Sequence, residues 1–303
     1  MKTPVWGGLP LLFAAACPAS SPATSEAPRP SWGLEASPSQ PAQWLGEAPA
    51  AVPQRVVTLA PGLTELTFAL GAGDAVVATS RFADFPPEAL DRPRVGGLTD
   101  LNVEAILAAG PDVVVGIFAE AYRSKLDTLV RAEVPVLLLP SSSIADFAES
   151  ARVLGKLLDR RDEAAALVSR LAGDLASVSP APGNRPPRVA VVYGWRPLFL
   201  AGPGSFPDEL LHLLGASNVV SEGSAWTQWS YEAFAASRPD VLIDATSERG
   251  RIPAVLSHLP AARSGRIYPA PESLARPGPR LGAAAQALGR IFTSTAPSFR
   301  AHP

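Results

Sequence analysis

The sequence is poor in the residues that build disulfides and metal sites. Its 303 residues include one cysteine and three histidines. Because Cys17 is the only cysteine, no intramolecular disulfide can form. The histidines, His212, His258 and His302, stand at unrelated places in the chain, whereas receptors for zinc or manganese gather His and carboxylate ligands at one site. The composition therefore disfavours a receptor for a bare metal ion.

Signatures of the common enzyme classes are missing as well. The chain has no GxSxG elbow, no P-loop and no HExxH motif, and the glycine-rich stretch at 202–204 does not complete a phosphate-binding pattern. The formal net charge is −2, and nucleic-acid binding requires a concentrated basic surface. These absences disfavour an enzyme and a nucleic-acid-binding protein.

The N-terminal segment has the pattern of an export signal. Lys2 precedes a short apolar run over 5–16, which is too short to span a membrane. The run ends in Ala-Ala-Ala before Cys17 and resembles a bacterial lipobox. We expect a signal peptide over 1–17 with lipidation at Cys17, the alternative being a plain signal peptide with an incidental cysteine. Residues 18–53 are rich in Pro, Ala and Ser without apolar periodicity, which predicts a flexible tether between the membrane and the folded domain. We expect an exported, lipid-anchored protein in the periplasm or at the outer face of the cell membrane.

One pattern then occurs twice. Residues 102–115 (NVEAILAAGPDVVV) return as 230–243 (SYEAFAASRPDVLI). Each copy begins with an N-cap residue, has a glutamate two positions later and ends in Pro-Asp followed by an apolar strand. A second echo precedes each copy in the same order, 65–72 (ELTFALGA) against 209–216 (ELLHLLGA). The repeat predicts two copies of one α/β unit, with a ligand cleft between them.

Apolar strands alternate with amphipathic helices in both halves, which predicts parallel βαβ units. In the first half we expect strands at 55–59, 75–79, 112–115 and 135–139, and helices at 63–70, 103–109 and 121–133. In the second half we expect strands at 188–193, 240–244 and 266–269, and helices at 207–214, 231–236 and 280–293. The prediction is an α/β fold of two similar lobes, 54–158 and 186–299, each around a parallel-type sheet.

A helical segment joins the two predicted lobes. Apolar residues recur at helical spacing over 144–178, and the pattern slips at 160–162, so the segment forms either one helix or two. We expect a connecting helix over 159–180. A helical strut bends less than extended linkers, which predicts only modest lobe closure.

Several segments together resemble a known family. They are 56–66 (VVTLAPGLTEL), 85–87 (FPP), 95–97 (VGG) and 111–114 (PDVV). In order and spacing they are similar to the periplasmic substrate-binding proteins for vitamin B12 and iron-siderophores, most of all to the cobalamin-binding members. The resemblance covers about 54–295. It implies a class III periplasmic binding protein: two lobes on a helical backbone, a shallow ligand cleft, no enzymatic activity or cofactor of its own, and an ABC permease with its ATPase as partner.

The resemblance also implies ligand-binding positions. In cobalamin binders aromatic side chains flank the planar corrin, because flat apolar faces stack on rings. An acid and an arginine near the last helix can accept from and donate to the corrin's amides. Matched onto this chain, the ligand-binding positions are Phe82, Leu98, Ile117, Phe118, Trp195, Phe199, Trp226, Trp229, Glu272 and Arg276. Leu98 and Ile117 stand where the family has tryptophans, and Glu272 replaces an aspartate. Cobalamin is therefore expected first, followed by another corrinoid, haem or a ferric siderophore.

Glu104 and Glu232, the glutamates of the repeat, match the two family residues that dock onto permease arginines. The alternative is that both only complement a helix dipole. A further alternative for the whole chain is a lipoprotein that keeps this fold for sensing or adhesion.

Overall fold

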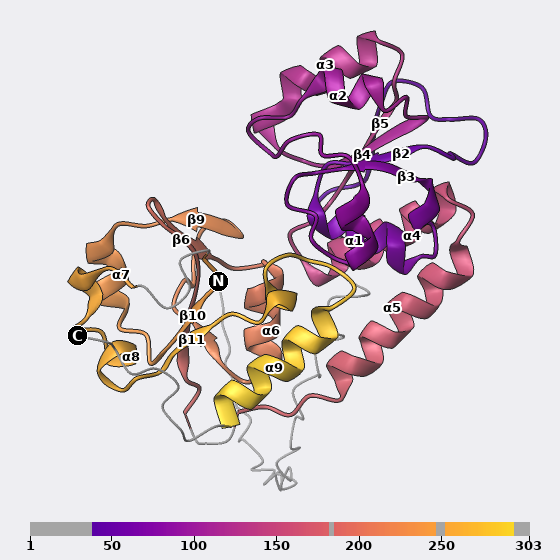
Figure 1. Cartoon of the computed structure of the whole chain (residues 1–303). Helices are drawn as coiled ribbons and strands as arrows, with labels where there is room; N and C mark the ends of the chain where they lie inside the picture. Colours follow the sequence, from indigo (N-terminus) through magenta and orange to yellow (C-terminus); the bar gives the residue numbers. More distant parts are fainter. Residues whose placement is uncertain (1–37, 182–184, 247–251, 294–303) are drawn as a thin grey trace, which may run out of the picture. The chain divides into compact units, whose positions relative to one another are not determined.

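The computed structural model describes residues 38–181, 185–246 and 252–293, all within one compact unit (Figure 1). The expected signal peptide, Cys17 and the first part of the expected tether lie outside the described residues. No helix in the described ranges is both long and apolar enough to cross a bilayer.

The N-terminal lobe is built around a five-stranded sheet. Its strands are β1 (Gln43–Leu45), β2 (Val56–Thr58), β3 (Val76–Thr79), β4 (Val113–Ile117) and β5 (Val136–Leu139), in the order β1-β5-β4-β2-β3. Its helices are α1 (Pro61–Ala69), α2 (Val103–Ala108), α3 (Arg123–Arg131) and the short turns η1 (Gly73–Ala75), η2 (Pro87–Asp91) and η3 (Glu120–Tyr122). Figure 1 shows α2 and α3 on one face of the sheet and α1 and α4 (Ile144–Leu157) on the other.

The C-terminal lobe is built around a second sheet. Its strands are β6 (Arg188–Trp195), β7 (Leu198–Ala201), β9 (Trp226–Gln228), β10 (Val241–Asp244) and β11 (Ile267–Pro269), in the order β11-β10-β6-β7-β9, with β8 (Ser217–Asn218) paired to β6. Its helices are α6 (Phe206–Leu213), α7 (Tyr231–Ser237), α8 (Pro260–Arg263) and α9 (Leu281–Thr293), with η4 (Ala254–Leu256) and η5 (Glu272–Leu274). Figure 1 shows α7 and α8 on one face and α6 and α9 on the other.

Two differences from the expected parallel-type sheets have simple causes. β7 runs antiparallel to β6 and β9, because only two residues separate β6 from β7 and a parallel crossover needs a dozen or more. β1 lies in the segment expected to be a tether and pairs antiparallel with β5. The flexible tether predicted to residue 53 is therefore wrong for 43–45, and both sheets are mixed.

The repeat is confirmed in the geometry of the two lobes. Asn102 and Ser230 cap α2 and α7 by accepting from the amides three residues on, as predicted. The aspartate of each Pro-Asp then binds the start of a neighbouring strand, β2 in the N-terminal lobe and β6 in the C-terminal lobe. Asp112 accepts from the amide of Arg55 at 2.9 Å, and Asp240 accepts from the amide of Arg188 at 3.0 Å. The two halves thus use the same contacts at the same positions.

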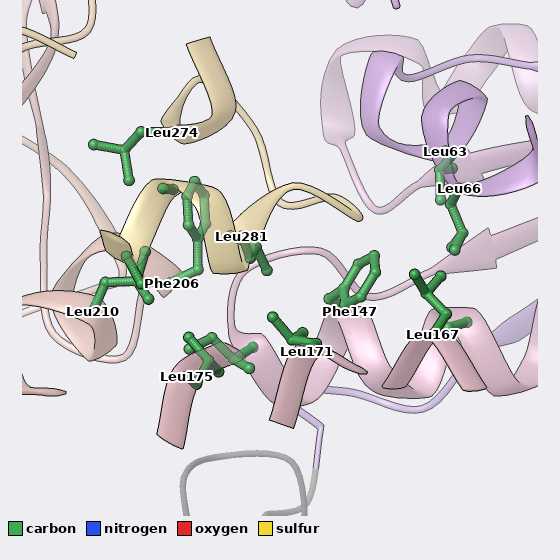
Figure 2. Close-up of a cluster of buried hydrophobic side chains, with 14 of the residues drawn as sticks. Leu63, Leu66, Phe147, Leu167, Leu171, Leu175, Phe206, Leu210, Leu274 and Leu281 are labelled. Atoms are coloured by element: carbon green, nitrogen blue, oxygen red, sulfur yellow. The ribbon is translucent and has the colours of Figure 1, made fainter. Parts of the chain in front are cut away.

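Two helices, not one, lead from the first lobe to the second. α4 packs on α5 (Arg161–Ala176), and α5 packs on α9. Asp159, with φ of 54°, lies in the break between α4 and α5 where the sequence pattern slips. One buried cluster extends from α1, α4 and α5 to α6, η5 and α9 (Figure 2). Burial of apolar surface therefore continues across the boundary between the lobes.

Candidate functional site

A cavity lies where the two lobes meet. Its volume is about 120 Å³, and it is lined by Ala60, Pro61, Gly62, Leu63, Leu66, Ile117, Pro140, Ser141, Phe147 and Ser150 of the N-terminal lobe and by Arg276 and Pro277 of the C-terminal lobe. Ala60, Ile117 and Pro140 stand at the carboxyl ends of β2, β4 and β5. Ligands of open α/β sheets bind at this edge, outside the ends of the strands.

The loop after β3 exposes apolar side chains on the N-terminal lobe. Phe82 is 59% exposed and Leu98 is 42% exposed. The Phe82 ring packs against Gly97, where an added Cβ would lie 2.8 Å from its Cε2 atom. Arg81, whose guanidinium lies 5.4 Å from the Phe82 ring centre, also pairs with Asp100. The predicted residues Phe82 and Leu98 are therefore both apolar and exposed to solvent, and the Phe82 ring packs against its neighbours in the loop.

Aromatic side chains gather on the C-terminal lobe around Trp226, which is partly exposed. Phe199 stacks on it at 6.3 Å with an interplanar angle of 11°, and Tyr193 meets it edge-on at 5.1 Å. Phe206 completes the group at 5.9 Å. The Tyr193 hydroxyl donates to the carbonyl oxygen of Leu274 at 2.6 Å, and burial raises its pKa well above the usual value. Of the predicted aromatics, the structure thus brings Phe199 and Trp226 together, and Trp226 also packs on Tyr193 and on the fully buried Phe206, which the sequence analysis did not name.

Three other predicted aromatics lie elsewhere. Trp195 is 4% exposed and packs on Phe234 in the core, so its ring is closed to a ligand. Trp229 packs against the same core cluster. Phe118 lines a separate hollow with Gln43 on β1, whereas its neighbour Ile117 lines the cavity between the lobes. Ile117 is the last residue of β4, and Phe118 begins the loop that follows it.

Arg276, a predicted ligand residue, lines the cavity, and its guanidinium is hydrogen-bonded to the N-terminal lobe. Its Nε donates to Oε1 of Glu65 at 2.7 Å, its Nη1 to the carbonyl oxygen of Phe82 at 3.3 Å, and its Nη2 to the carboxylate of Asp84. All three of its nitrogens therefore serve the N-terminal lobe. Glu272, the predicted acid, begins η5 and is exposed.

A second arginine joins this group. Arg280 donates to the two carboxylate oxygens of Glu65 at 2.9 and 2.7 Å, and its guanidinium lies 4.2 Å from the ring centre of Phe85. The hydrogen bonds with Glu65 raise the pKa of Arg280. Glu65, Asp84 and Arg280 were not among the predicted site residues. The available signal was Glu65 itself, whose counterpart in the second echo is Glu209.

The two glutamates of the repeat are both exposed. Glu104 and Glu232 are the second residues of α2 and α7, in the first helical turn of each. Hydrogen bonds from its own backbone N–H and from Ser230 hold the pKa of Glu232 below its usual value. These positions present a carboxylate to solvent at equivalent places on the two lobes.

Metal ligands do not cluster in the described ranges, where no three His, Cys, Asp or Glu side chains come close enough to hold an ion. The polar groups near the cavity are instead the paired charges of Glu65, Asp84, Arg276 and Arg280.

Comparison with known proteins identifies the family of the chain. Residues 56–274 match the family model described as periplasmic binding protein. The vitamin B12-binding protein of Pectobacterium atrosepticum is 30% identical over 200 residues, which is 64% of this chain and 72% of that protein.

Solved structures share the fold. The periplasmic vitamin B12 binding protein of Vibrio cholerae has a TM-score of 0.65 at 24% identity, covering 80% of this chain and 97% of that one. A periplasmic haem-binding protein of Pseudomonas aeruginosa has a TM-score of 0.69 at 26% identity, covering 80% and 94%. These relatives are substrate-binding proteins and not enzymes. With two such lobes and a family match across both, the chain belongs to the periplasmic binding protein family.

Proposed function

We propose that this protein captures cobalamin or a related corrinoid between its lobes and delivers it to an ABC permease. The observation that carries the proposal is that each lobe leaves apolar or aromatic side chains open to solvent. The N-terminal lobe offers exposed Phe82 and Leu98, and the C-terminal lobe offers partly exposed Phe199 and Trp226. Flat apolar side chains of this kind stack on a planar macrocycle at low entropic cost.

Haem is the second candidate, since the Pseudomonas relative is named as haem-binding. Haem iron in proteins is held by His, Cys, Met or Tyr side chains. The hydroxyls of Tyr122, Tyr193 and Tyr231 each bond to a main-chain carbonyl oxygen, and Tyr268 is 5% exposed in the core. These placements leave the tyrosines committed to the scaffold.

Neither of the two described histidines lines the cavity between the lobes. His212 lies on α6 with its Nδ1 atom 2.9 Å from the carbonyl oxygen of Asp208, and His258 lines a hollow with Arg238 and Arg263. A corrinoid can be held by stacking and by hydrogen bonds to its peripheral amides. The placement of the tyrosines and histidines therefore supports a corrinoid over haem.

Delivery and anchoring complete the proposal. Glu104 and Glu232 dock onto arginines of the permease, and the lipid on Cys17 keeps the protein at the membrane. Charges at an interface rim mainly set encounter rate and register, which matches exposed carboxylates on two separate lobes.

A titration of the purified protein with cyanocobalamin, haemin and ferrichrome, followed by tryptophan fluorescence, tests the proposal. We expect the tightest binding and the largest quenching with the corrinoid, because Trp226 lies at the proposed contact surface. Tighter binding of haemin would favour the second candidate. Absence of binding to all three would remove the capture function.

Replacement of Trp226 by leucine tests the contact directly. The variant keeps apolar volume and loses the flat face, so we expect Kd for cyanocobalamin to rise about tenfold, as aromatic contacts contribute about 0.5–1.5 kcal/mol beyond their area. The matched control is Trp195→Phe, which alters the core tryptophan and should lower thermal stability while leaving Kd unchanged. Equal Kd values for Trp226→Leu and wild type would move Trp226 to the scaffold.

A further inference from the structure

Glu65 is a buried carboxylate whose partners come from the other lobe. Its side chain is 2% exposed on α1, and it accepts from Arg276 and Arg280, more than two hundred residues along the chain. A buried charge is tolerated when it is paired and hydrogen-bonded, and its loss leaves the partner charges uncompensated. The carboxylate therefore fixes two guanidinium groups at the lobe boundary.

Through these arginines the C-terminal lobe holds the exposed loop of the N-terminal lobe. Arg276 donates to the carbonyl oxygen of Phe82 and pairs with Asp84, and Arg280 lies over the ring of Phe85. We name Glu65, Asp84, Arg276 and Arg280 the interlobe clamp. The loop that the clamp holds is the one that presents Phe82.

Backbone packing beside the clamp is equally close. Gly62 on α1 faces the carbonyl oxygen of Pro277, and a Cβ at Gly62 would collide with it. The backbone of Gly62 does not have positive φ. Glycine is thus required there by the approach of the opposite lobe and not by its own conformation.

The equivalent glutamate of the C-terminal lobe also makes a contact across the lobe boundary. Glu209, the counterpart of Glu65 in the echo, accepts from the amide of Ile144 on α4 at 2.6 Å. The amide of Phe206 at the start of the same helix donates to the carbonyl oxygen of Ser142 at 2.7 Å. The glutamate of α1 therefore binds the C-terminal lobe, and the equivalent glutamate of α6 binds the start of α4.

We propose that Glu65 is a positioning residue of the ligand site, which sets the spacing of the lobes and holds the Phe82 loop in place through Arg276 and Arg280. The inference rests on the proposed function, since it concerns the same site. It assigns Arg276 to the clamp and leaves stacking on Phe82 and Trp226 as the main ligand contact. Ligand affinity then depends on a residue that the ligand does not touch.

Two variants open the clamp in different ways. Glu65→Gln keeps the shape of the side chain and removes its charge. Gly62→Ala keeps every charge and adds a methyl group against Pro277, at a helical position where alanine is otherwise favoured over glycine. The control is Leu129→Ala, which truncates a fully buried residue of α3. Leu129 belongs to a separate core cluster of the N-terminal lobe, so the change lowers stability away from the clamp.

Hydrogen exchange and cyanocobalamin titration give the readouts, at a temperature where all variants remain folded. We expect both clamp variants to raise exchange rates at 80–85 and 278–281 and to raise Kd at least tenfold. Leu129→Ala should change neither. Unchanged exchange in Glu65→Gln and Gly62→Ala would overturn the clamp, and faster exchange with unchanged Kd would overturn its role in positioning the site.

The two proposals fail separately. If the wild-type protein binds no corrinoid, the proposed function fails, and hydrogen exchange in the apo protein still decides whether Glu65 holds the loop. If wild type binds the corrinoid and the variants bind it equally well, only the positioning role fails.

Discussion

Glu209 is a carboxyl group whose charge is disfavoured by burial. Burial raises its pKa to about 7, against the hydrogen bond from Ile144 that lowers it. Asp146 and Asp208 raise the pKa further, and His212 lowers it. The side chain sits between α6 and the start of α4, so its protonation state bears on the contact between the two lobes.

The stability of the protein should therefore fall as pH rises through the range from 4.5 to about 7. In that range the folded state retains a proton on Glu209 that the unfolded state has released, and the free energy of unfolding decreases with pH. The loss is on the order of 3 kcal/mol, since each pKa unit between 4.5 and about 7 corresponds to about 1.4 kcal/mol. Above pH 7 this contribution should be constant.

Chemical denaturation of Glu209→Gln at several pH values measures the effect. The amide oxygen of glutamine can still accept from Ile144 without a charge, so we expect the variant to be more stable than wild type at pH 8 and nearly equal at pH 4.5. Glu222→Gln, in an exposed loop, is the control and should follow wild type. An identical pH profile for Glu209→Gln and wild type would show that this carboxylate is not responsible.

Individual side chains were the least predictable feature of the site. Trp195 and Trp226 both stand in segments with polar or glycine neighbours, and only the packing of Phe234 against one and Phe199 against the other separates core from surface. Glu65 looked like an ordinary helix residue. Its partners lie more than two hundred positions away, and no local pattern records such a pairing.

At the level of elements, β1 depends on one buried aspartate. Asp146 accepts from the amide and hydroxyl of Ser39 at 2.6 and 2.7 Å, and also from the amides of Ser142 and Ser143. It also completes the capping box of α4 with Ser143. One carboxylate thus joins the segment before β1 to the start of α4.

Asp146→Asn should release this segment. The amide nitrogen of asparagine cannot accept, so at least one of the four donors loses its partner, at a cost of about 1–3 kcal/mol for a buried group. We expect faster hydrogen exchange at 39–45 and a lower free energy of unfolding. Asp127→Asn, an exposed change on α3, is the control. Unaltered exchange at 39–45 would show that pairing of β1 with β5 holds the segment without Asp146.

Elements with a strong periodic pattern were predictable to within a few residues. Burial on one face explains the local patterns of most strands and helices, namely β2 to β6, β10, β11, α1 to α7 and α9. The sequence did not predict β1, β7, β8, β9 or α8. β7 and β9 belong to an aromatic-rich stretch that resembles a ligand loop, and β1 has only three residues within a proline-rich segment. Short strands of this kind are fixed by their neighbours in the sheet and not by their own propensity.

On the scale of the whole molecule, the two lobes share more than their topology. The same helix start carries an exposed glutamate in each lobe, at Glu104 and Glu232, and the same earlier helix carries one that crosses the boundary, at Glu65 and Glu209. The repeat in the sequence predicted the two-lobed fold and its duplicated helix caps. It did not distinguish the exposed pair from the boundary pair, because burial depends on how the lobes pack.

Docking onto a permease should require both exposed glutamates. A carboxylate that meets an arginine at each end fixes register, and replacement by arginine places like charges together, which costs several kcal/mol. In proteoliposomes containing the permease and its ATPase, we expect Glu104→Arg or Glu232→Arg alone to reduce ligand transport about tenfold, and the double variant to abolish the transport that the binding protein stimulates.

The affinity for cyanocobalamin should persist in all three variants, because these carboxylates lie outside the proposed contact surface. Glu222→Arg, which reverses an exposed charge elsewhere on the C-terminal lobe, controls for net charge and should transport normally. Full transport by the double variant would mean that the two glutamates only complement the dipoles of α2 and α7, and that the permease recognises another surface.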